Sequence, residues 1–480
     1  MNTDLLVFNG INGTTGEYLT RPISPDSLSQ LILGERPDQQ HLNELRVKHQ
    51  LDMEDYLGPK EGIDSKKLAE TGWGVIFAHD ADPAIRGALS ELLAHRQRQA
   101  TACKEKYYQE YSGIRGYRPG ESKGRFLARH GAGPGPPTPE NVPYYLLIVG
   151  SPESIPFRFQ FQLDVQYAVG RIYFDTLEEY ARYAHSVVAA ETGKIILPRR
   201  ATFFGVRNEE DRATALSADY LVKPLAEAMK NDQVSWDVET VLQYDAKKER
   251  LARLLGGGES PAFLFTASHG MGFSCGHPAQ MAHQGALLCQ DWPGPKKWKQ
   301  PIPEDFYFSC EDVGKNARIH GMVTFHFACY GAGTPRLDDF AHANPTAREP
   351  IARNAFVARL PQRMLAHPKG GALAVIGHVE RAWGYSFAWT GAGPQLATFE
   401  SAAKRLMEGH TVGSALEYFN QRYAAISSDL STELENIKFG EPVDEFGLCG
   451  LWTANNDARS YAIIGDPAVK LAVSDAAAIA

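Results

Sequence analysis

The sequence lacks any apolar run long enough to cross a membrane. A spanning helix needs about 18 or more consecutive apolar residues, and no segment of the 480 residues provides them. The N-terminal sequence MNTDLLVFNGINGTTGEYL has neither a basic start nor a long apolar centre, so it does not look like a secretory signal. We therefore expect a cytoplasmic protein that does not bind membranes.

Cysteine and positive charge are also scarce. Six cysteines in 480 residues are too few for a disulfide scaffold, so we expect reduced thiols. The formal net charge is −8, from 49 basic and 57 acidic residues. No long basic run compensates for this balance, which excludes a general nucleic-acid-binding protein.

A zinc site also lacks its usual sequence pattern. Cysteines and histidines, which are typical zinc ligands, gather between residues 271 and 320: Cys275, His277, His283, Cys289 and Cys310. The paired two-residue spacing of zinc ribbons and fingers is absent. We therefore predict no metal, and expect this segment to cover a cleft or to contact a partner.

Apolar segments alternate with amphipathic ones from residue 144 onwards. Strands are predicted at 144–150, 167–174, 201–206, 238–242, 263–270, 323–329 and 372–377. The closing segment 461–473, YAIIGDPAVKLAV, is predicted to form a strand, a turn at Gly465-Asp466-Pro467 and an edge strand. Helices are predicted at 82–99, 176–191, 212–230, 245–255, 351–366, 395–408 and 412–427. Alternation of this kind predicts an α/β fold, with a mostly parallel sheet and helices on both faces.

The chain divides into four stretches by composition. Residues 1–72 are polar and irregular and form an N-terminal extension, with a weakly amphipathic patch at 40–55. Residues 73–143 contain a strand, a helix and the glycine- and proline-rich loop 131–140. Residues 144–260 and 261–480 are the two halves of the main domain, and the second carries the insertion 271–320.

Two reactive side chains follow buried strands of the main domain. His269 ends the run FLFTASHG and Cys329 ends TFHFACYG. Because the carboxyl ends of parallel strands meet at one edge of a sheet, we expect these side chains to lie together there. A thiol beside an imidazole is the minimum for a cysteine nucleophile with its base. Taken alone, Cys329 is better explained as a buried core thiol, and His269 as a cap of its strand. Taken together at two strand ends, they predict catalysis.

The order of several motifs resembles the caspase-like (clan CD) cysteine peptidases, and most closely the gingipain-type family. The motifs are LLIVGSPESIP (146–156), AVGRI (168–172), TASHG, FHFACYG, GALAVIGHVERAW (371–383) and IIGDPAVKL (463–471). They span residues 144–472. The resemblance implies a caspase-like sheet and an endopeptidase that acts on proteins or peptides through an acyl-enzyme, without a cofactor. Unlike gingipains, which are secreted, this sequence shows no signal.

The resemblance also implies roles for residues. Cys329 would be the nucleophile and His269 the general base and acid. The amides of Gly270 and Cys329 would bind the oxyanion, and a glycine at 270 lets a substrate backbone approach. Trp383 would line the substrate pocket, although an ordinary core position is an equal alternative.

Acidic residues after the strand at 201–206 serve the site in that family. By this analogy Glu209 or Glu210 would orient the histidine. Asp211 would pair with an arginine or lysine of the substrate, which predicts cleavage after a basic residue. The alternative for Asp211 is an N-cap of the helix that starts at Arg212.

A second function stays open at this point. The same scaffold could serve as a catalytically silent or regulatory binding module, in a bacterial defence or cell-death system, with a regulatory protein as partner. Residues 1–72, 131–140 and 271–320 are candidates for restraining an intracellular protease. A non-proteolytic cysteine acyltransferase would share the two reactive side chains but has no other support in the sequence.

Overall fold

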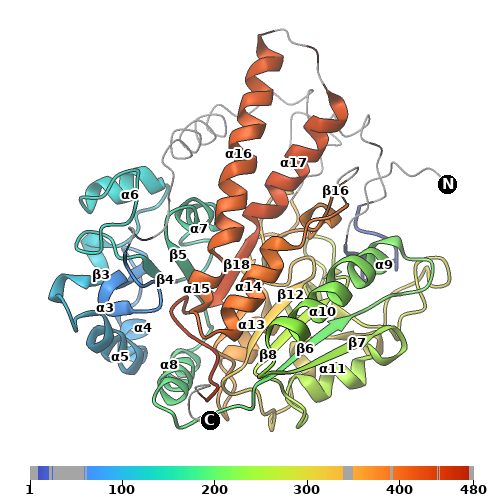
Figure 1. Cartoon of the computed structure of the whole chain (residues 1–480), viewed down its shortest axis with the longest axis horizontal. Coiled ribbons are helices and arrows are strands. Elements are labelled where there is room, and N and C mark those ends of the chain that lie inside the picture. Colours follow the sequence, from blue (N-terminus) through green and yellow to red (C-terminus); the bar gives the residue numbers. More distant parts are fainter. Residues whose placement is uncertain are drawn as a thin grey trace.

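A ten-stranded sheet forms the centre of the molecule (Figure 1). The computed structural model describes residues 9–20, 62–338, 350–389, 393–439 and 444–474, with the single positions 24, 59 and 442. In spatial order the strands are β3 (Tyr108–Tyr111), β2 (Trp73–Phe77), β4 (Tyr145–Val149), β5 (Ala168–Ile172), β18 (Tyr461–Gly465), β15 (Ala374–His378), β12 (Val323–Phe327), β8 (Phe263–Ala267), β6 (Arg200–Gly205) and β7 (Asp237–Leu242). The expected α/β architecture is confirmed.

The sheet consists of two parallel halves that run in opposite directions. Every neighbouring pair is parallel except β15 and β18, which are antiparallel in the middle of the sheet. Residues 144–260 contribute β4 and β5 to one half of the sheet and β6 and β7 to the other. Residues 261–480 also contribute to both halves, because β18 pairs with β5 while β8, β12 and β15 lie in the other half. The sheet is therefore mostly parallel, as predicted, but the halves of the sheet are not the halves of the sequence.

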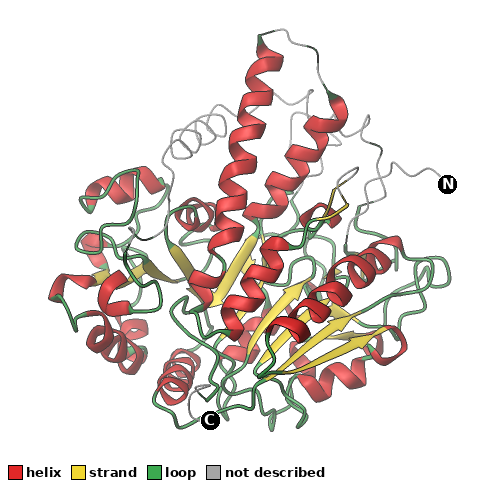
Figure 2. Ribbon diagram, viewed as in Figure 1, coloured by secondary structure: helices red, strands yellow, loops and turns green. Residues whose placement is uncertain are grey.

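Helices pack around the sheet (Figure 2). The predicted helix at 176–191 is α8 (Leu177–Glu191), which begins with a capping box formed by Thr176 and Glu179. The predicted helix at 395–408 is α14 (Ala397–Met407). The longest described helix, α16 (Glu417–Lys438), packs against α17 (Glu445–Arg459), and both project beyond the sheet in Figure 1.

Other helices are shorter or more broken than their patterns predict. The segment 82–99 forms α4 (Pro83–Ala88) and α5 (Ser90–Ala100), which meet at Leu89. The segment 212–230 forms α9 (Arg212–Ser217), a π-helical turn (Ala218–Val222) and α10 (Lys223–Asp232). The segments 248–254 and 359–365 form α11 (Lys248–Leu254) and α13 (Arg359–Leu365). The predicted helix start at 351 is wrong, because Phe356–Val357 form β14 instead and pair with β13 (Gly333–Thr334).

Three of the sequence motifs hold the first half of the sheet together. Arg171 of AVGRI is buried and donates to the carbonyl oxygens of Gly150 and Ile155, at 2.9 and 2.7 Å. A side chain at Gly170 would overlap the backbone of Gly465, so glycine is required there. Asp466 of the closing motif accepts hydrogen bonds from Arg96 and from Trp73. These motif residues build the scaffold, away from the reactive side chains.

The insertion 271–320 is largely irregular and packs against the N-terminal segment. Its short elements are β9 (Met271–Gly272), α12 (Gln280–His283), β10 (Leu287–Leu288) and β11 (Tyr307–Phe308). Strand β1 (Ile11–Asn12) pairs with β9 in parallel, and Ile11 lies in one apolar cluster with Trp292 and other side chains of the insertion. The amphipathic patch at 40–55 lies outside the described residues. None of the described helices is long and apolar enough to cross a membrane.

Candidate active site

Neighbouring strands bring His269 and Cys329 to one edge of the sheet. Strands β8 and β12 are parallel, and Ala267 is in register with Phe327. Each reactive residue lies two positions after the last residue of its strand. Both residues therefore lie at the same edge of the sheet, at equivalent positions beyond the two neighbouring strands. Both side chains are buried. The shared edge that the sequence predicts for these residues is present.

The imidazole of His269 is held from both of its nitrogen atoms. Nε2 lies 2.6 Å from a carboxylate oxygen of Asp211, and the backbone N–H of Gly10 donates to Nδ1 at 2.7 Å. Because Nδ1 accepts a hydrogen bond, the proton of the neutral ring belongs on Nε2 and is donated to Asp211. The rings of Tyr18 and Trp292 pack edge-on against the imidazole. The ring is thus fixed in orientation and in tautomer.

Asp211 is the carboxylate that orients the histidine. Thr214 donates to Oδ2 at 2.7 Å, and Tyr18 donates to Oδ1 at 2.7 Å. The side chain also accepts from the amide of Ala213 at 3.2 Å, so the N-cap expected for Asp211 is confirmed. Burial alone would raise the pKa of Asp211, but the charge and hydrogen bond of His269 and the two hydroxyl donors hold that pKa below its ordinary value.

Glu209 and Glu210 lie on the surface instead of at the histidine. Their partners are Lys297 and Lys296 of the insertion. The expectation that one of them orients His269 is therefore corrected, because Asp211 holds that position. The expected pairing of Asp211 with a basic substrate side chain is corrected as well, since both of its oxygens are already engaged.

The thiol of Cys329 points at a peptide bond of the same chain. Its sulfur contacts the carbonyl oxygen of Asn9 and accepts from the amide of Ala382 at 3.2 Å. Burial raises the pKa of the Cys329 thiol to about 12, although the Ala382 amide acts in the opposite direction. Burial of the sulfur therefore favours the neutral thiol over the thiolate.

The Asn9–Gly10 peptide bond lies between the two reactive side chains. Its carbonyl end contacts Cys329 and its amide end donates to His269. The oxygen and nitrogen of one amide are roughly 2.3 Å apart, so Sγ and Nδ1 lie within roughly 8 Å of each other. The amide of Asn9 also donates to the carbonyl oxygen of Ala382 at 3.3 Å. One peptide unit therefore occupies the space where both groups converge.

Gly270 lies directly against the backbone of Cys329. A Cβ atom at position 270 would overlap the carbonyl oxygen of Cys329 and would approach its amide nitrogen to 2.8 Å. Glycine is therefore required for the two strand ends to approach each other. The role of the Gly270 amide in binding an oxyanion stays a prediction.

Trp383 belongs to the loop that contacts Asn9. It is buried and directly follows Ala382, the residue whose backbone contacts both Asn9 and Cys329. The amide of Trp383 donates to Asp457 of α17 at 3.0 Å, and Ser386 donates to the same carboxylate. Burial raises the pKa of Asp457 to about 7. Helix α17 thus anchors the loop that lines the site.

The N-terminal contribution to this site was not predicted from the sequence. Asn9 contacts Cys329, whereas Gly10 and Tyr18 contact His269. Residues 1–72 nevertheless carry no sequence pattern that indicates a function. The Asn-Gly dipeptide at positions 12 and 13 is typical of a turn, and a turn is present there, since Gly16 donates to the carbonyl oxygen of Asn12. A turn does not indicate where its segment binds, and here the segment contacts His269, about 260 residues further along the sequence.

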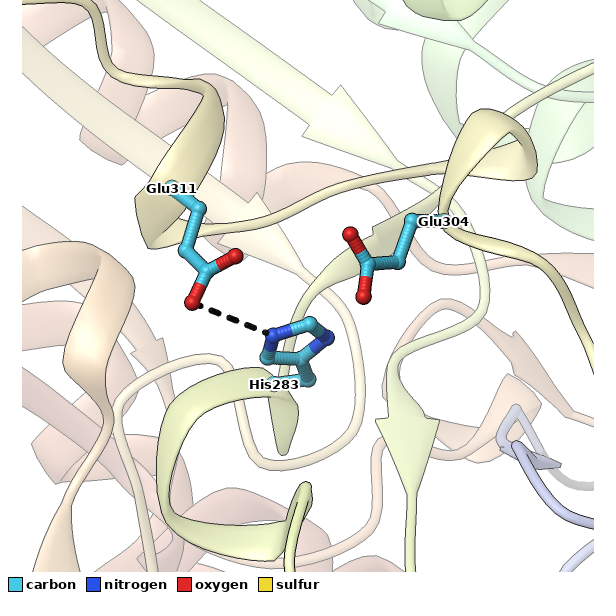
Figure 3. A group of neighbouring side chains, drawn as sticks. All are labelled: His283, Glu304 and Glu311. Atoms are coloured by element: carbon cyan, nitrogen blue, oxygen red, sulfur yellow. Dashed lines mark ion pairs between the residues drawn. The ribbon is translucent and has the colours of Figure 1, made fainter.

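A group of potential metal ligands lies in the insertion (Figure 3). His283, Glu304 and Glu311 offer ligand atoms within 4.8 Å of one another. However, Nδ1 of His283 is hydrogen-bonded to Tyr307 at 2.6 Å, and both glutamates are exposed. All six cysteines are free, and none belongs to a group of three or more potential ligands among the described residues.

Comparisons with known proteins give low-identity likenesses in fold. No protein-family model and no curated protein matches this sequence. A solved structure described as "Structure of Protease" is 12% identical, covers 84% of this chain and 80% of its own, and has a TM-score of 0.48. A complex of the pro- and mature domains of RgpB from Porphyromonas gingivalis is 10% identical, covers 83% and 80%, and has a TM-score of 0.43. The function proposed below rests on the geometry of the site.

Proposed function

We propose that the protein is a cysteine endopeptidase in which Cys329 is the nucleophile and His269 the general base and acid. The observation that carries this proposal is the Asn9–Gly10 peptide bond, whose two ends contact the thiol and the imidazole. These are the ends that peptide hydrolysis must address: the carbonyl group that is attacked and the amine that leaves. The motifs that resemble those of gingipain-type peptidases agree with this chemistry.

The arrangement supports each step of acyl transfer. His269 takes the proton of the Cys329 thiol, and the sulfur attacks the carbonyl carbon of a bound peptide. Asp211 accepts from Nε2 and stabilises the imidazolium that forms. The imidazole then gives its proton to the leaving amine, for which Nδ1 is already placed. Water finally hydrolyses the thioester, with no cofactor.

Among the described residues, the carboxylates considered for pairing with a basic substrate side chain already have partners of their own. Asp211 serves His269, while Glu209 and Glu210 pair with lysines on the surface. Near the cysteine, Arg381 already neutralises Asp338 and Glu380, with guanidinium–carboxylate distances of 2.6 and 3.0 Å. A preference for arginine or lysine therefore has no structural support here, and we do not retain it.

Hydrolysis of an unfolded protein tests the proposal. The full chain should degrade fluorescently labelled casein after incubation under reducing conditions. The variants Cys329→Ala and His269→Ala should lose at least about a thousandfold in rate, because each removes a group that forms or breaks a bond. Cys449→Ala, which changes another buried thiol, is the matched control and should retain full activity.

The outcome separates a peptidase from a silent scaffold. If casein hydrolysis persists in Cys329→Ala while circular dichroism shows a folded protein, another group is responsible and the assignment fails. If no hydrolysis occurs in the wild type and a thiol-reactive peptidyl electrophile labels Cys329 no faster than Cys449, the binding-module alternative replaces the proposal.

A further inference from the structure

The N-terminal segment occupies the site in the manner of a peptide substrate. The carbonyl group of Asn9 faces the thiol of Cys329, and the amide of Gly10 donates to Nδ1 of His269. The amide of Asn9 donates to the carbonyl oxygen of Ala382, on the loop that also carries Trp383. Backbone contacts therefore align one specific peptide bond, the bond between Asn9 and Gly10, with both reactive groups.

The residues after this bond are firmly docked. Ile11 donates to Gly270 at 3.3 Å and pairs with Met271, and Gly13 donates to Gly272 at 2.8 Å. Ile11 is fully buried, and Tyr18 reaches back to Asp211. These contacts fix the position of Gly10 relative to the imidazole, so the register of the segment is set by the fold.

A side chain at Gly10 would disturb this alignment. Gly10 has a φ of 141°, which favours glycine, and a Cβ atom there would lie 3.1 Å from the sulfur of Cys329 and 2.7 Å from Leu19. Glycine lets the backbone pass close to the nucleophile. The same closeness leaves no room for a second peptide, so an external substrate cannot enter while Asn9–Gly10 is in place.

Asn9 itself shows which kind of side chain the site accepts before the bond. The residue is only 4% exposed. A buried amide side chain is tolerated when hydrogen bonds satisfy it, whereas a buried charged side chain carries a much larger desolvation penalty. A neutral side chain is therefore buried at position 9 at a lower cost than a charged one.

We propose that the Asn9–Gly10 bond is the first substrate of this active site, so that each chain cuts itself there, and that the site cleaves after asparagine. This inference rests on the proposed cysteine peptidase function. The sulfur of Cys329 forms a thioester with the carbonyl carbon of Asn9, and the C–N bond to Gly10 breaks. The thiol proton passes through His269 to the new Gly10 amine. One water molecule then hydrolyses the thioester and releases residues 1–9, which opens the carbonyl side of the site.

The test follows the intact mass of the purified full chain over time under reducing conditions. The wild type should lose residues 1–9 and yield a product that begins at Gly10. Cys329→Ala should stay whole, which also excludes spontaneous chemistry at the Asn–Gly bond, because that chemistry needs no thiol. The rate should not change when the protein is diluted tenfold, since the bond is cut within its own chain.

Substitutions at position 9 test the specificity. Asn9→Lys and Asn9→Asp should slow self-cleavage at least about tenfold, since each buries a charge. Glu17→Gln changes an exposed residue of the same segment and is the matched control, which should cut at the wild-type rate. If Asn9→Lys cuts as fast as the wild type, the preference for asparagine is refuted.

A parallel casein assay separates this inference from the proposed function. Thiol-dependent casein hydrolysis by a chain that keeps its Asn9–Gly10 bond intact would overturn self-cleavage and leave the peptidase assignment standing. If folded protein, as judged by circular dichroism, shows neither casein hydrolysis nor self-cleavage, both the proposed peptidase function and the self-cleavage inference are refuted.

Discussion

Replacing Asp211 by asparagine tests the role that the structure assigns to this buried carboxylate. His269 and Thr214 approach one of its oxygens, and Tyr18 and Ala213 approach the other. An asparagine can offer an oxygen to only one of these sides. Its NH₂ group would face either the backbone N–H of Ala213, which cannot accept, or Nε2 of His269, which would have to change tautomer.

The expected effect of Asp211→Asn is large. The variant loses the negative charge that stabilises the imidazolium. Its single side-chain oxygen can accept either from Nε2 of His269, which keeps the tautomer, or from the amide of Ala213, which keeps the N-cap. Loss of the correct tautomer in a catalytic triad reduces the rate about 10⁴-fold; we expect about 10³- to 10⁴-fold here. A thousandfold loss corresponds to about 4 kcal/mol of transition-state stabilisation.

The assay is the initial rate of casein hydrolysis, with Glu209→Gln and Glu210→Gln as matched controls. Both control residues are exposed and should stay within about twofold of the wild type, because surface ion pairs contribute little. Thermal unfolding of each variant confirms that it is folded. If Glu209→Gln or Glu210→Gln loses as much activity as Asp211→Asn, the assignment of Asp211 as the orienting carboxylate is refuted.

Three other predictions concern the scaffold. Gly270→Ala should abolish casein hydrolysis and lower the melting temperature, because a methyl group would overlap the backbone of Cys329. The control Gly124→Ala adds a methyl group in open space on α6 (Lys123–Arg129) and should raise the free energy of unfolding in urea by about 0.5–1 kcal/mol. The same effect of both variants on stability would contradict this explanation. Arg96→Met should destabilise the fold by about 3–5 kcal/mol in urea unfolding, since the buried Asp466 and the partly buried Glu191 both lose their guanidinium partner. A change below about 1 kcal/mol would show that these ion pairs are dispensable. Burial lowers the pKa of His326 to about 3, so the unfolded chain binds a proton there that the folded chain excludes, and this residue alone should cost about 2 kcal/mol of stability as the pH drops from 7.5 to 5. His326→Leu should reduce the pH dependence of urea unfolding by about that amount, and an unchanged dependence would refute the contribution of His326.

The sheet and its two reactive strand ends could be predicted because they depend on local patterns. Apolar runs that stop at glycine identified β8 and β12, and the rule that parallel strands end at one edge brought His269 and Cys329 together. The capping signal at Asp211 was also local, and the structure shows that a residue can cap a helix and hold a histidine at once.

The remainder of the site depends on long-range contacts that leave no periodic signal. Sequence alone could not decide among Glu209, Glu210 and Asp211, which are adjacent, because the choice depends on which carboxylate turns inward at the helix start. The docking of Asn9–Gly10 depends on the shape that the insertion acquires only after folding. The antiparallel pairing of β18 with β15, where the two halves of the sheet meet, could not be predicted either. An apolar strand pattern does not indicate which strand is its neighbour or in which direction that neighbour runs.

Covalent labelling tests the central claim, a nucleophilic thiol at position 329, most directly. After incubation under reducing conditions, the full chain is treated with a peptidyl acyloxymethyl ketone that carries asparagine before the reactive group, and the adduct is located by peptide mass spectrometry. The proposed chemistry predicts one adduct per chain, on Cys329, and its loss in His269→Ala. Labelling spread equally over Cys103, Cys275 and Cys329, or unaffected by His269→Ala, would contradict it.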